Sequence, residues 1–139
     1  MLEKLIRFYK KPATLREKEI ANLMTDFLEA YNRRDIGHII ASFEEGAFVD
    51  SLTVNKRVGT EEYSVILSNT LSNLKTAKMD NAVIRASEDE ATVQGIFEII
   101  QQNDTRASNM YRVHYHRGKD GAWKITDVLY LTRYRPRPI

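Results

Sequence analysis

Asp50 is a carboxylate in the middle of a segment that otherwise favours burial. Residues 47–54, which include Phe48 and Val49, are typical of a β-strand and precede a polar connection over residues 55–57. A carboxylate partly shielded by apolar neighbours is a stronger base than a solvated one, as proton abstraction next to a carbonyl requires. The sequence therefore predicts that Asp50 is either a general base or a residue that ends the strand and caps a turn.

His114 and His116 lie two residues apart on a predicted strand, so their side chains share one face with Arg112. The opposite face carries aromatic and apolar residues: Tyr111, Val113 and Tyr115. We therefore expect the histidines on the outer face, where they meet solvent or a second copy of the chain. On the reverse assignment, His114 becomes an acid or base in a pocket. No metal site is predicted, because two histidines need a third ligand and no nearby carboxylate has suitable spacing.

Asp127 shares strand parity with Trp123, Ile125 and Leu129, which predicts that it lies on an apolar face. A buried carboxylate needs a partner or becomes neutral. A neutral Asp127 could donate a hydrogen bond to a ligand oxygen and take part in catalysis. The interpretation that we favour is structural, with Arg112 or a backbone amide as its partner.

Aromatic side chains could line a cavity with apolar rings and polar tips. We predict that six residues contact a ligand: Phe27, Tyr31, Phe48, Tyr63, Tyr111 and Trp123. The chain has no cysteine, Gly-rich phosphate loop, nucleophile elbow or HExxH motif. Disulfides and thiolate metal sites are therefore excluded, and no cofactor is predicted.

Length and composition predict one soluble domain with its own core. The 139 residues are 42% apolar and 29% charged, and no apolar run has the length of a membrane span or the form of a signal peptide. A cytoplasmic location is expected. The net charge of +2 hides basic ends, because residues 1–18 and 133–139 carry an excess of Lys and Arg. We interpret these ends as solvated tails, and nucleic-acid binding is not favoured because no binding motif accompanies them.

Three helices are predicted in the first half of the chain. A capping box at Thr14 begins the first helix, and its apolar stripe continues at helical spacing to Tyr31. Asp35 caps a second, shorter helix that Gly46 ends. Thr60 begins the third helix, with acidic residues in its first turn.

After Lys75 the period of the apolar residues changes from that of a helix to that of a strand. Strands are predicted over 77–87, 91–102, 107–117 and 122–134, with hairpin-like turns between them. This order predicts an α+β domain over 14–134, in which a curved antiparallel sheet wraps around three N-terminal helices and leaves a pocket at its open end. Residues 1–13 are predicted to be a basic amphipathic extension with a short helix ended by Pro12, and residues 135–139 a basic tail.

Three stretches of the sequence resemble the nuclear transport factor 2-like superfamily. The stretch "AYNRRDIGHIIASFEEGAFVDS" resembles its helix–Asp–helix–strand passage, "RVGTEEYSVIL" its Gly-then-helix element, and "GKDGAWKITDVLYLTRY" its closing hairpin. The order and spacing of these pieces carry the resemblance, which covers about residues 15–134. It implies a cone-shaped, cystatin-like fold, which steroid delta-isomerases, SnoaL-like polyketide cyclases, dehydratases and transport factors share.

The resemblance implies a role for Asp50, because steroid delta-isomerases place their general-base aspartate at this distance before the Gly-then-helix element. Proton abstraction also needs a group that stabilises the enolate oxygen. The isomerases use a tyrosine on the first helix and a protonated aspartate on a late strand. Phe27 stands at the tyrosine position, and Tyr31 lies one turn later as a partial substitute. The late-strand position falls near residues 112–114, where no carboxylate is present.

Three functions follow as hypotheses. The first, which we predict, is a domain that binds a small apolar or carbonyl-containing ligand in its cone. The alternative is a cofactor-independent isomerase, cyclase or dehydratase, with Asp50 as the general base and Tyr31, His114 or Asp127 as helper. The third is an assembly module that forms a homodimer through its sheet, and a homodimer is compatible with all three. The incomplete set of acid and base groups favours the first.

Overall fold

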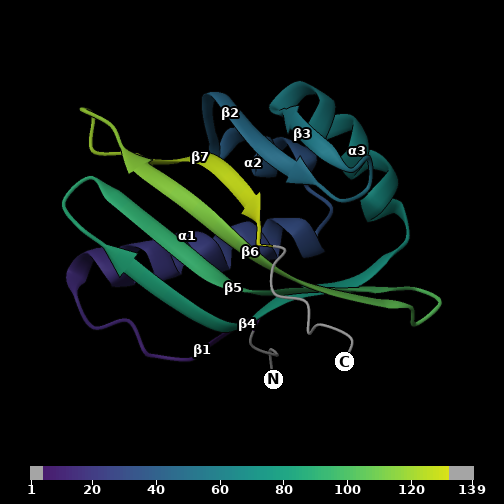
Figure 1. Cartoon of the computed structure of the whole chain (residues 1–139), viewed down its shortest axis with the longest axis horizontal. Helices are drawn as coiled ribbons and strands as arrows, with labels where there is room; N and C mark the ends of the chain where they lie inside the picture. The colour runs from purple at the N-terminus through teal and green to yellow at the C-terminus, as the bar shows by residue number, and fades with distance from the viewer. Residues whose placement is uncertain (1–4, 132–139) are drawn as a thin grey trace, which may run out of the picture.

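The computed structural model describes residues 5–131, and the basic tail predicted over 135–139 lies outside them. In chain order the elements are β1 (Ile6–Phe8), α1 (Leu15–Asn32), α2 (Ile36–Ala41), β2 (Phe43–Ser51), β3 (Lys56–Gly59), α3 (Thr60–Ser72), β4 (Leu74–Ala86), β5 (Glu90–Gln101), β6 (Arg106–Arg117) and β7 (Trp123–Tyr130). All three helices precede the strands β4 to β7, which confirms the predicted α+β class (Figure 1).

The seven strands form one sheet in the order β1-β4-β5-β6-β7-β2-β3. Strands β4 to β7 pair antiparallel, as predicted. The pairs β1–β4 and β2–β7 are parallel, so the sheet as a whole is mixed. Helix α1 packs on one face of the sheet, chiefly on β4, and α3 lies beside β2 and β3 (Figure 1). The opposite face, called the outer face below, carries no helix of the described range.

The first two helices begin where their capping residues predict. The Thr14 hydroxyl accepts a hydrogen bond from the Glu17 amide at 3.1 Å, and the Glu17 carboxylate accepts one from the Thr14 amide at 3.1 Å. The apolar stripe of α1, which includes Met24, is buried against the sheet. Asp35 caps α2, because its Oδ1 accepts a hydrogen bond from the His38 amide at 3.1 Å.

The segment after α2 differs from the prediction. Helix α2 ends at Ala41, and Gly46 lies inside β2 instead of at the end of the helix. Gly46 has a φ of +81° and sits where the pairing of β2 with β7 shifts register between Phe43 and Phe48, so it belongs to a bulge. Residues 56–59, expected to begin as a polar connection, form β3. A glycine that ends a helix and a glycine in a bulge look alike in a sequence, so local pattern did not separate them.

The short helix predicted within residues 1–13 is wrong for Ile6–Phe8, which form β1. This strand lies parallel to β4, and the Tyr9 amide continues the pairing with a 2.9 Å hydrogen bond to the Ala82 carbonyl oxygen. Ile6 is buried against the core. Three residues are too few to distinguish the helical from the strand period, so the edge of β4 decides the conformation.

A second bulge bends the sheet at β4. Asn81 has a φ of +52°, and the pairing of β4 with β5 shifts register between Asp80 and Val83. Gly95 of β5 faces this bulge, and a Cβ at Gly95 would lie only 2.9 Å from the Asp80 carbonyl oxygen. The close approach of the two backbones therefore requires glycine. Bulges increase strand bending and twist, which helps the long strands to curve around the helices.

Two side chains at the end of α1 tie this helix to its neighbours. Asn32 Nδ2 donates hydrogen bonds to the carbonyl oxygens of Leu28 and Ala77, each at 2.8 Å, and Asn32 Oδ1 accepts one from the Ala77 amide at 2.9 Å. The Arg34 guanidinium donates to the Leu71 carbonyl oxygen at the end of α3 at 2.9 Å. These contacts tie the C-terminal end of α1 to β4 and to the end of α3.

Candidate functional site

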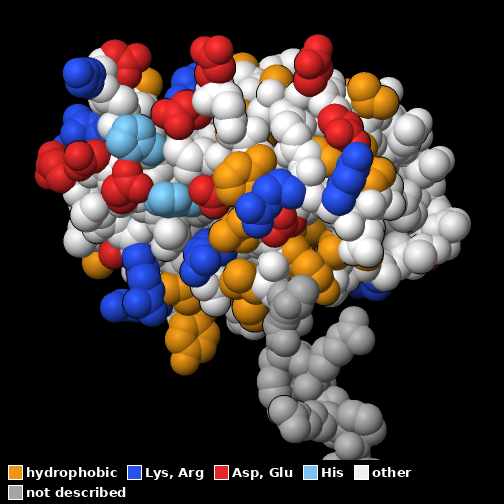
Figure 2. Space-filling view, turned by 45° about the horizontal axis from the view of Figure 1, so that its top comes forward, with side chains coloured by type: hydrophobic (Ala, Val, Ile, Leu, Met, Phe, Trp, Pro, Cys, Tyr) orange, Lys and Arg blue, Asp and Glu red, His pale blue; other side chains and the backbone are white. Residues whose placement is uncertain are grey.

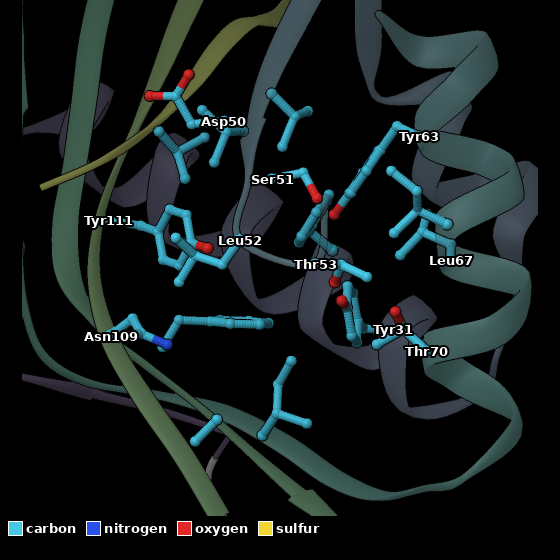
Figure 3. A pocket seen from close by; sticks show the side chains of 18 of the residues that line it. Tyr31, Asp50, Ser51, Leu52, Thr53, Tyr63, Leu67, Thr70, Asn109 and Tyr111 are labelled. Atoms are coloured by element: carbon cyan, nitrogen blue, oxygen red, sulfur yellow. The ribbon is translucent and has the colours of Figure 1, made fainter. Parts of the chain in front are cut away.

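A cavity of about 460 Å³ lies between the inner face of the sheet and the facing sides of α1 and α3 (Figure 3). Its walls are mainly apolar and include Met24, Leu67, Met79, Phe97 and Val113. Its mouth is bordered by the β2–β3 connection, the last turn of α3, and the paired ends of β5 and β6. This volume is in the range of pockets that hold small molecules. The pocket expected inside the curved sheet is therefore present.

Tyr31 from α1 and Tyr63 from α3 bring two hydroxyl groups together inside the cavity (Figure 3). The two side chains share a hydrogen bond. Burial raises the pKa of both tyrosines well above the ordinary value of 10, so both hydroxyls stay protonated. Ser51 of β2 is buried, and its hydroxyl points toward the same region. These three hydroxyls form an uncharged polar group in an otherwise apolar interior.

Two more of the predicted ligand contacts line this cavity. Phe27 lies beside Tyr31 on α1, with ring centroids 6.1 Å apart. The ring of Tyr111 on β6 packs edge-to-face against Phe97, with ring centroids 6.3 Å apart. Burial raises the pKa of Tyr111 to about 12. The structure thus brings Phe27, Tyr31, Tyr63 and Tyr111 together from three different elements.

Asp50 lies at the wall of the cavity, but its carboxylate is engaged elsewhere. Oδ1 accepts a hydrogen bond from Arg57 Nε at 3.0 Å, and Oδ2 accepts one from the Tyr130 backbone amide at 3.3 Å. Arg57 is the residue directly opposite Asp50 in the β2–β3 pair. Figure 3 shows the carboxylate turned away from the two tyrosines, whereas the neighbouring Ser51 points inward. The charge of Asp50 is therefore compensated outside the cavity.

His114 and Asp127, predicted as helpers in catalysis, do not line the cavity. His114 Nδ1 lies 3.4 Å from Asp127 Oδ2, and His114 Nε2 lies 2.7 Å from Glu90 Oε1. His116 Nδ1 contacts the second oxygen of Glu90, and this hydrogen bond raises the pKa of His116 above 6.5. The four side chains form a cluster on the outer face of β5, β6 and β7, the face that strand parity predicts for the histidines.

The predicted position of Asp127 on the apolar face is wrong. The β6–β7 pairing shifts register, because Tyr115 pairs with Ile125 whereas His114 pairs with Asp127. The extra residue, Thr126, reverses the alternation of β7, so Ile125 turns inward and Asp127 turns outward. Counting alternate residues along the sequence therefore assigns Asp127 to the wrong face of the sheet.

Phe48 and Trp123, the remaining predicted ligand contacts, do not line the main cavity. Phe48 faces outward, where the Arg57 guanidinium lies 4.3 Å from the centre of its ring. Trp123 borders a second, smaller cavity of about 180 Å³ with Leu23 and Tyr115. Both residues are aromatic, but the strands that carry them point their rings elsewhere.

Sequence reasoning missed the polar residues at the mouth of the main cavity. Six uncharged side chains, the mouth residues, border it: Thr53, Asn69, Thr70, Asn73, Gln101 and Asn109. Thr70 carried a usable signal, because it interrupts the apolar stripe of the third helix between Leu67 and Leu71. The others lie near the ends of elements, where polar residues are expected in any water-soluble domain.

The cavity lining contains no lysine or arginine side chain, and its one acid is Asp50. Among residues 5–131, no group of three or more His, Cys, Asp or Glu side chains could hold a metal ion. No helix in the same part of the chain is long and apolar enough to cross a membrane.

No protein-family model matches the sequence, and no curated protein matches it. Solved structures with a similar fold do exist. A nuclear transport factor 2-like protein of unknown function from Pseudomonas putida gives a TM-score of 0.73 at 17% identity, over 85% of this chain and 87% of that chain. A protein of unknown function with a cystatin-like fold from Nostoc punctiforme gives a TM-score of 0.69 at 20% identity, over 87% and 93%.

A proposed ketosteroid isomerase from Shewanella frigidimarina gives a TM-score of 0.66 at 17% identity, over 79% of this chain and 92% of that chain. At these identities the similarity establishes the fold alone, because one fold carries many functions. The chain has the cystatin-like fold of nuclear transport factor 2-like proteins, which confirms the fold that the three sequence stretches predict.

Proposed function

We propose that this nuclear transport factor 2-like fold binds a small uncharged ligand, with an apolar body and a carbonyl or hydroxyl oxygen. The observation that supports this function is the cavity of about 460 Å³, which is apolar except for buried hydroxyls at its inner end and neutral side chains at its mouth. Pockets for small molecules combine these properties, with apolar walls for affinity and few polar groups for orientation.

The inner hydroxyls suit a ligand oxygen. Tyr31 and Tyr63 share one hydrogen bond, so one of their two O–H groups remains free to donate. The hydroxyl of Ser51 has no hydrogen-bond partner within residues 5–131. A hydroxyl without a partner in apolar surroundings costs free energy, and a ligand carbonyl that accepts its hydrogen bond removes that cost.

Binding is tested by titration with the neutral fluorophore N-phenyl-1-naphthylamine, whose emission increases in apolar surroundings. We expect saturable binding that Ala107→Trp abolishes, because residue 107 lines the mouth and the indole would fill it. Ser108→Trp is the matched control, because adjacent strand residues point to opposite faces. Absence of saturable binding, or equal loss in both variants, would overturn the proposal.

The alternative of an isomerase, cyclase or dehydratase has less support. Its general base, Asp50, is paired with Arg57 and directed away from the inner hydroxyls. We therefore expect no Asp50-dependent exchange of the α-protons of an unsaturated ketone in D₂O, measured by NMR. Exchange that Asp50→Asn removes would establish the enzymatic alternative instead.

We also propose that two copies of the chain associate through their outer sheet faces. Four apolar side chains that are not fully buried lie there on neighbouring strands: Phe48, Ile96, Met110 and Leu129. Ion pairs flank this apolar strip, namely Asp50–Arg57 and Lys78–Glu98. Figure 2 shows hydrophobic side chains gathered beside Lys, Arg, Asp and Glu side chains. Because acidic and basic side chains both flank the strip, it can pair with a copy of itself related by a twofold axis.

Light scattering coupled to gel filtration tests this association. We expect a dimer that Met110→Lys converts to a monomer, because a lysine would be desolvated at the centre of the interface. Val65→Lys is the control, since Val65 is 63% exposed on α3 and lies away from the sheet. A monomeric natural protein would exclude the dimer.

A further inference from the structure

The six mouth residues surround the opening of the cavity with hydrogen-bonding groups that carry no charge. Asn69, Thr70 and Asn73 belong to the last turn of α3 and its C-cap. The other three belong to the β2–β3 connection, β5 and β6. Figure 3 shows Thr53 and Thr70 on one side of the cavity and Asn109 on the other. A ligand longer than the apolar interior must pass between these side chains.

The mouth residues are free to bind a ligand. Within residues 5–131, none of the six side chains has a hydrogen-bond partner. Asn32 shows the contrast, because its amide is occupied by carbonyl and amide groups of α1 and β4. Each free Asn or Gln side chain offers two donors and an acceptor, and each Thr hydroxyl offers one donor and accepts as well. The opening can therefore form several hydrogen bonds at once with one polar group.

A charged group would gain little in the same place. The lining has no cationic side chain, and its one acid, Asp50, is already paired with Arg57. A carboxylate or sulfate that entered the opening would lose hydration without gaining a counter-charge. Hydroxyl and amide groups lose less hydration and regain hydrogen bonds to the mouth residues.

We propose that the ligand is an uncharged amphiphile whose polar head carries several hydroxyl or amide groups. The apolar body lies in the interior next to Tyr31 and Tyr63, and the head lies among the mouth residues. A neutral sugar joined to an apolar ring or chain is the simplest compound of this class. This inference rests on the proposed function and adds the chemical class of the ligand.

The test compares ligands that share one body and differ only in the head. The probes are 2-naphthol, its β-glucoside, its N-acetyl-β-glucosaminide and its β-glucuronide, each measured by displacement of N-phenyl-1-naphthylamine. We expect the two neutral sugars to bind about tenfold more tightly than 2-naphthol, as two net hydrogen bonds provide. The glucuronide differs from the glucoside by one carboxylate and should lose this gain. The glucosaminide adds an amide, so its ratio to the glucoside shows whether amide or hydroxyl groups dominate.

Two substitutions test whether the higher affinity of the neutral sugars depends on the mouth residues. Thr70→Val keeps the shape of the side chain and removes its hydroxyl, and Asn109→Leu removes the amide. In the double variant, the ratio of glucoside to naphthol affinity should fall toward one. Thr92→Val is the matched control, because Thr92 lies on β5 outside the cavity and its substitution should leave the ratio unchanged.

The outcomes separate this inference from the proposed function. If 2-naphthol binds and the neutral sugars bind no more tightly, the inference fails while ligand binding stands. Equal affinity of glucuronide and glucoside also overturns it. A second series on an octyl body repeats the comparison, so that a poor fit of the naphthyl ring does not decide the result. If no member of either series displaces the fluorophore, the inference fails, and if the fluorophore itself does not bind saturably, the proposed function fails as well.

Discussion

At the scale of single residues, the inner tyrosines define how a ligand is oriented. Tyr31→Phe and Tyr63→Phe each remove a hydroxyl and keep the ring. We expect either substitution to weaken binding of 2-acetylnaphthalene by about 1 kcal/mol, a factor of about five, because one hydrogen bond to its carbonyl is lost. Naphthalene itself has no acceptor, so its affinity should change much less. Equal weakening of both compounds in displacement titrations would indicate a changed cavity shape instead.

The same two tyrosines make stability depend on alkaline pH. In the folded protein, burial holds their pKa above 10, whereas tyrosines in the unfolded chain titrate near 10. As the pH rises through 10, the unfolded state loses protons that the folded state keeps, so the free energy of unfolding falls. Below that pH both states are protonated, and the contribution is constant.

Urea unfolding at a series of pH values measures this fall. The double variant Tyr31→Phe, Tyr63→Phe should show a shallower decrease above pH 10, because it lacks both titrating groups. Identical slopes for the variant and the natural protein would show that other groups cause the alkaline loss of stability.

At the scale of the elements, the contact between β4 and β5 depends on Gly95. A Cβ at this position would lie 2.9 Å from the Asp80 carbonyl oxygen and 3.0 Å from Met79 Cγ. Gly95→Ala should therefore destabilise the fold by about 1–3 kcal/mol, because the backbone of the bulge must move. Gly37→Ala is the control, since a Cβ at Gly37 in α2 meets only Asp35 Oδ1 at 3.8 Å, an ordinary contact, and should not destabilise the fold. Thermal unfolding followed by circular dichroism gives both values.

Local sequence signals predict the elements but not always their faces. The capping box at Thr14 and the cap at Asp35 are short-range interactions, so the sequence contains everything that fixes the two helix starts. The bulges at Gly46, Asn81 and Thr126 arise from pairing with strands far away in the chain. Each bulge can reverse the alternation beyond it, and no periodic pattern records this.

The site residues on helices were predicted more accurately than those on strands, because bulges affect only the strands. Phe27, Tyr31 and Tyr63 lie on regular helices, where spacing gives the buried face directly, and all three line the cavity. Phe48 and Asp127 lie beyond bulges, and both face outward. Reliable assignment of strand side chains would have required the register of the sheet.

At the scale of the whole molecule, the charges lie outside the cavity. Ion pairs such as Arg16–Glu88 and Lys75–Asp104 are on the surface, whereas the cavity has no uncompensated charge. Affinity for a neutral ligand should therefore be almost unchanged between low and high salt, because screening acts on charged partners. Titration of N-phenyl-1-naphthylamine over a range of NaCl concentrations measures this. A steep loss of affinity with salt would indicate a charged ligand site.

The bulge at Gly46 has a consequence for how such a site could change in evolution. Side chains alternate along a strand, and the three extra residues of β2 between Phe43 and Phe48 set which side chains of β2 point inward. Deleting one residue there, with the pairing at Phe43 and the length of the bulge both retained, would turn Asp50 into the cavity and Ser51 out of it. A carboxylate would then stand beside two protonated tyrosines, a combination suited to proton transfer. One deletion, without any substitution at the site, separates a binding pocket from the arrangement of an acid–base catalyst.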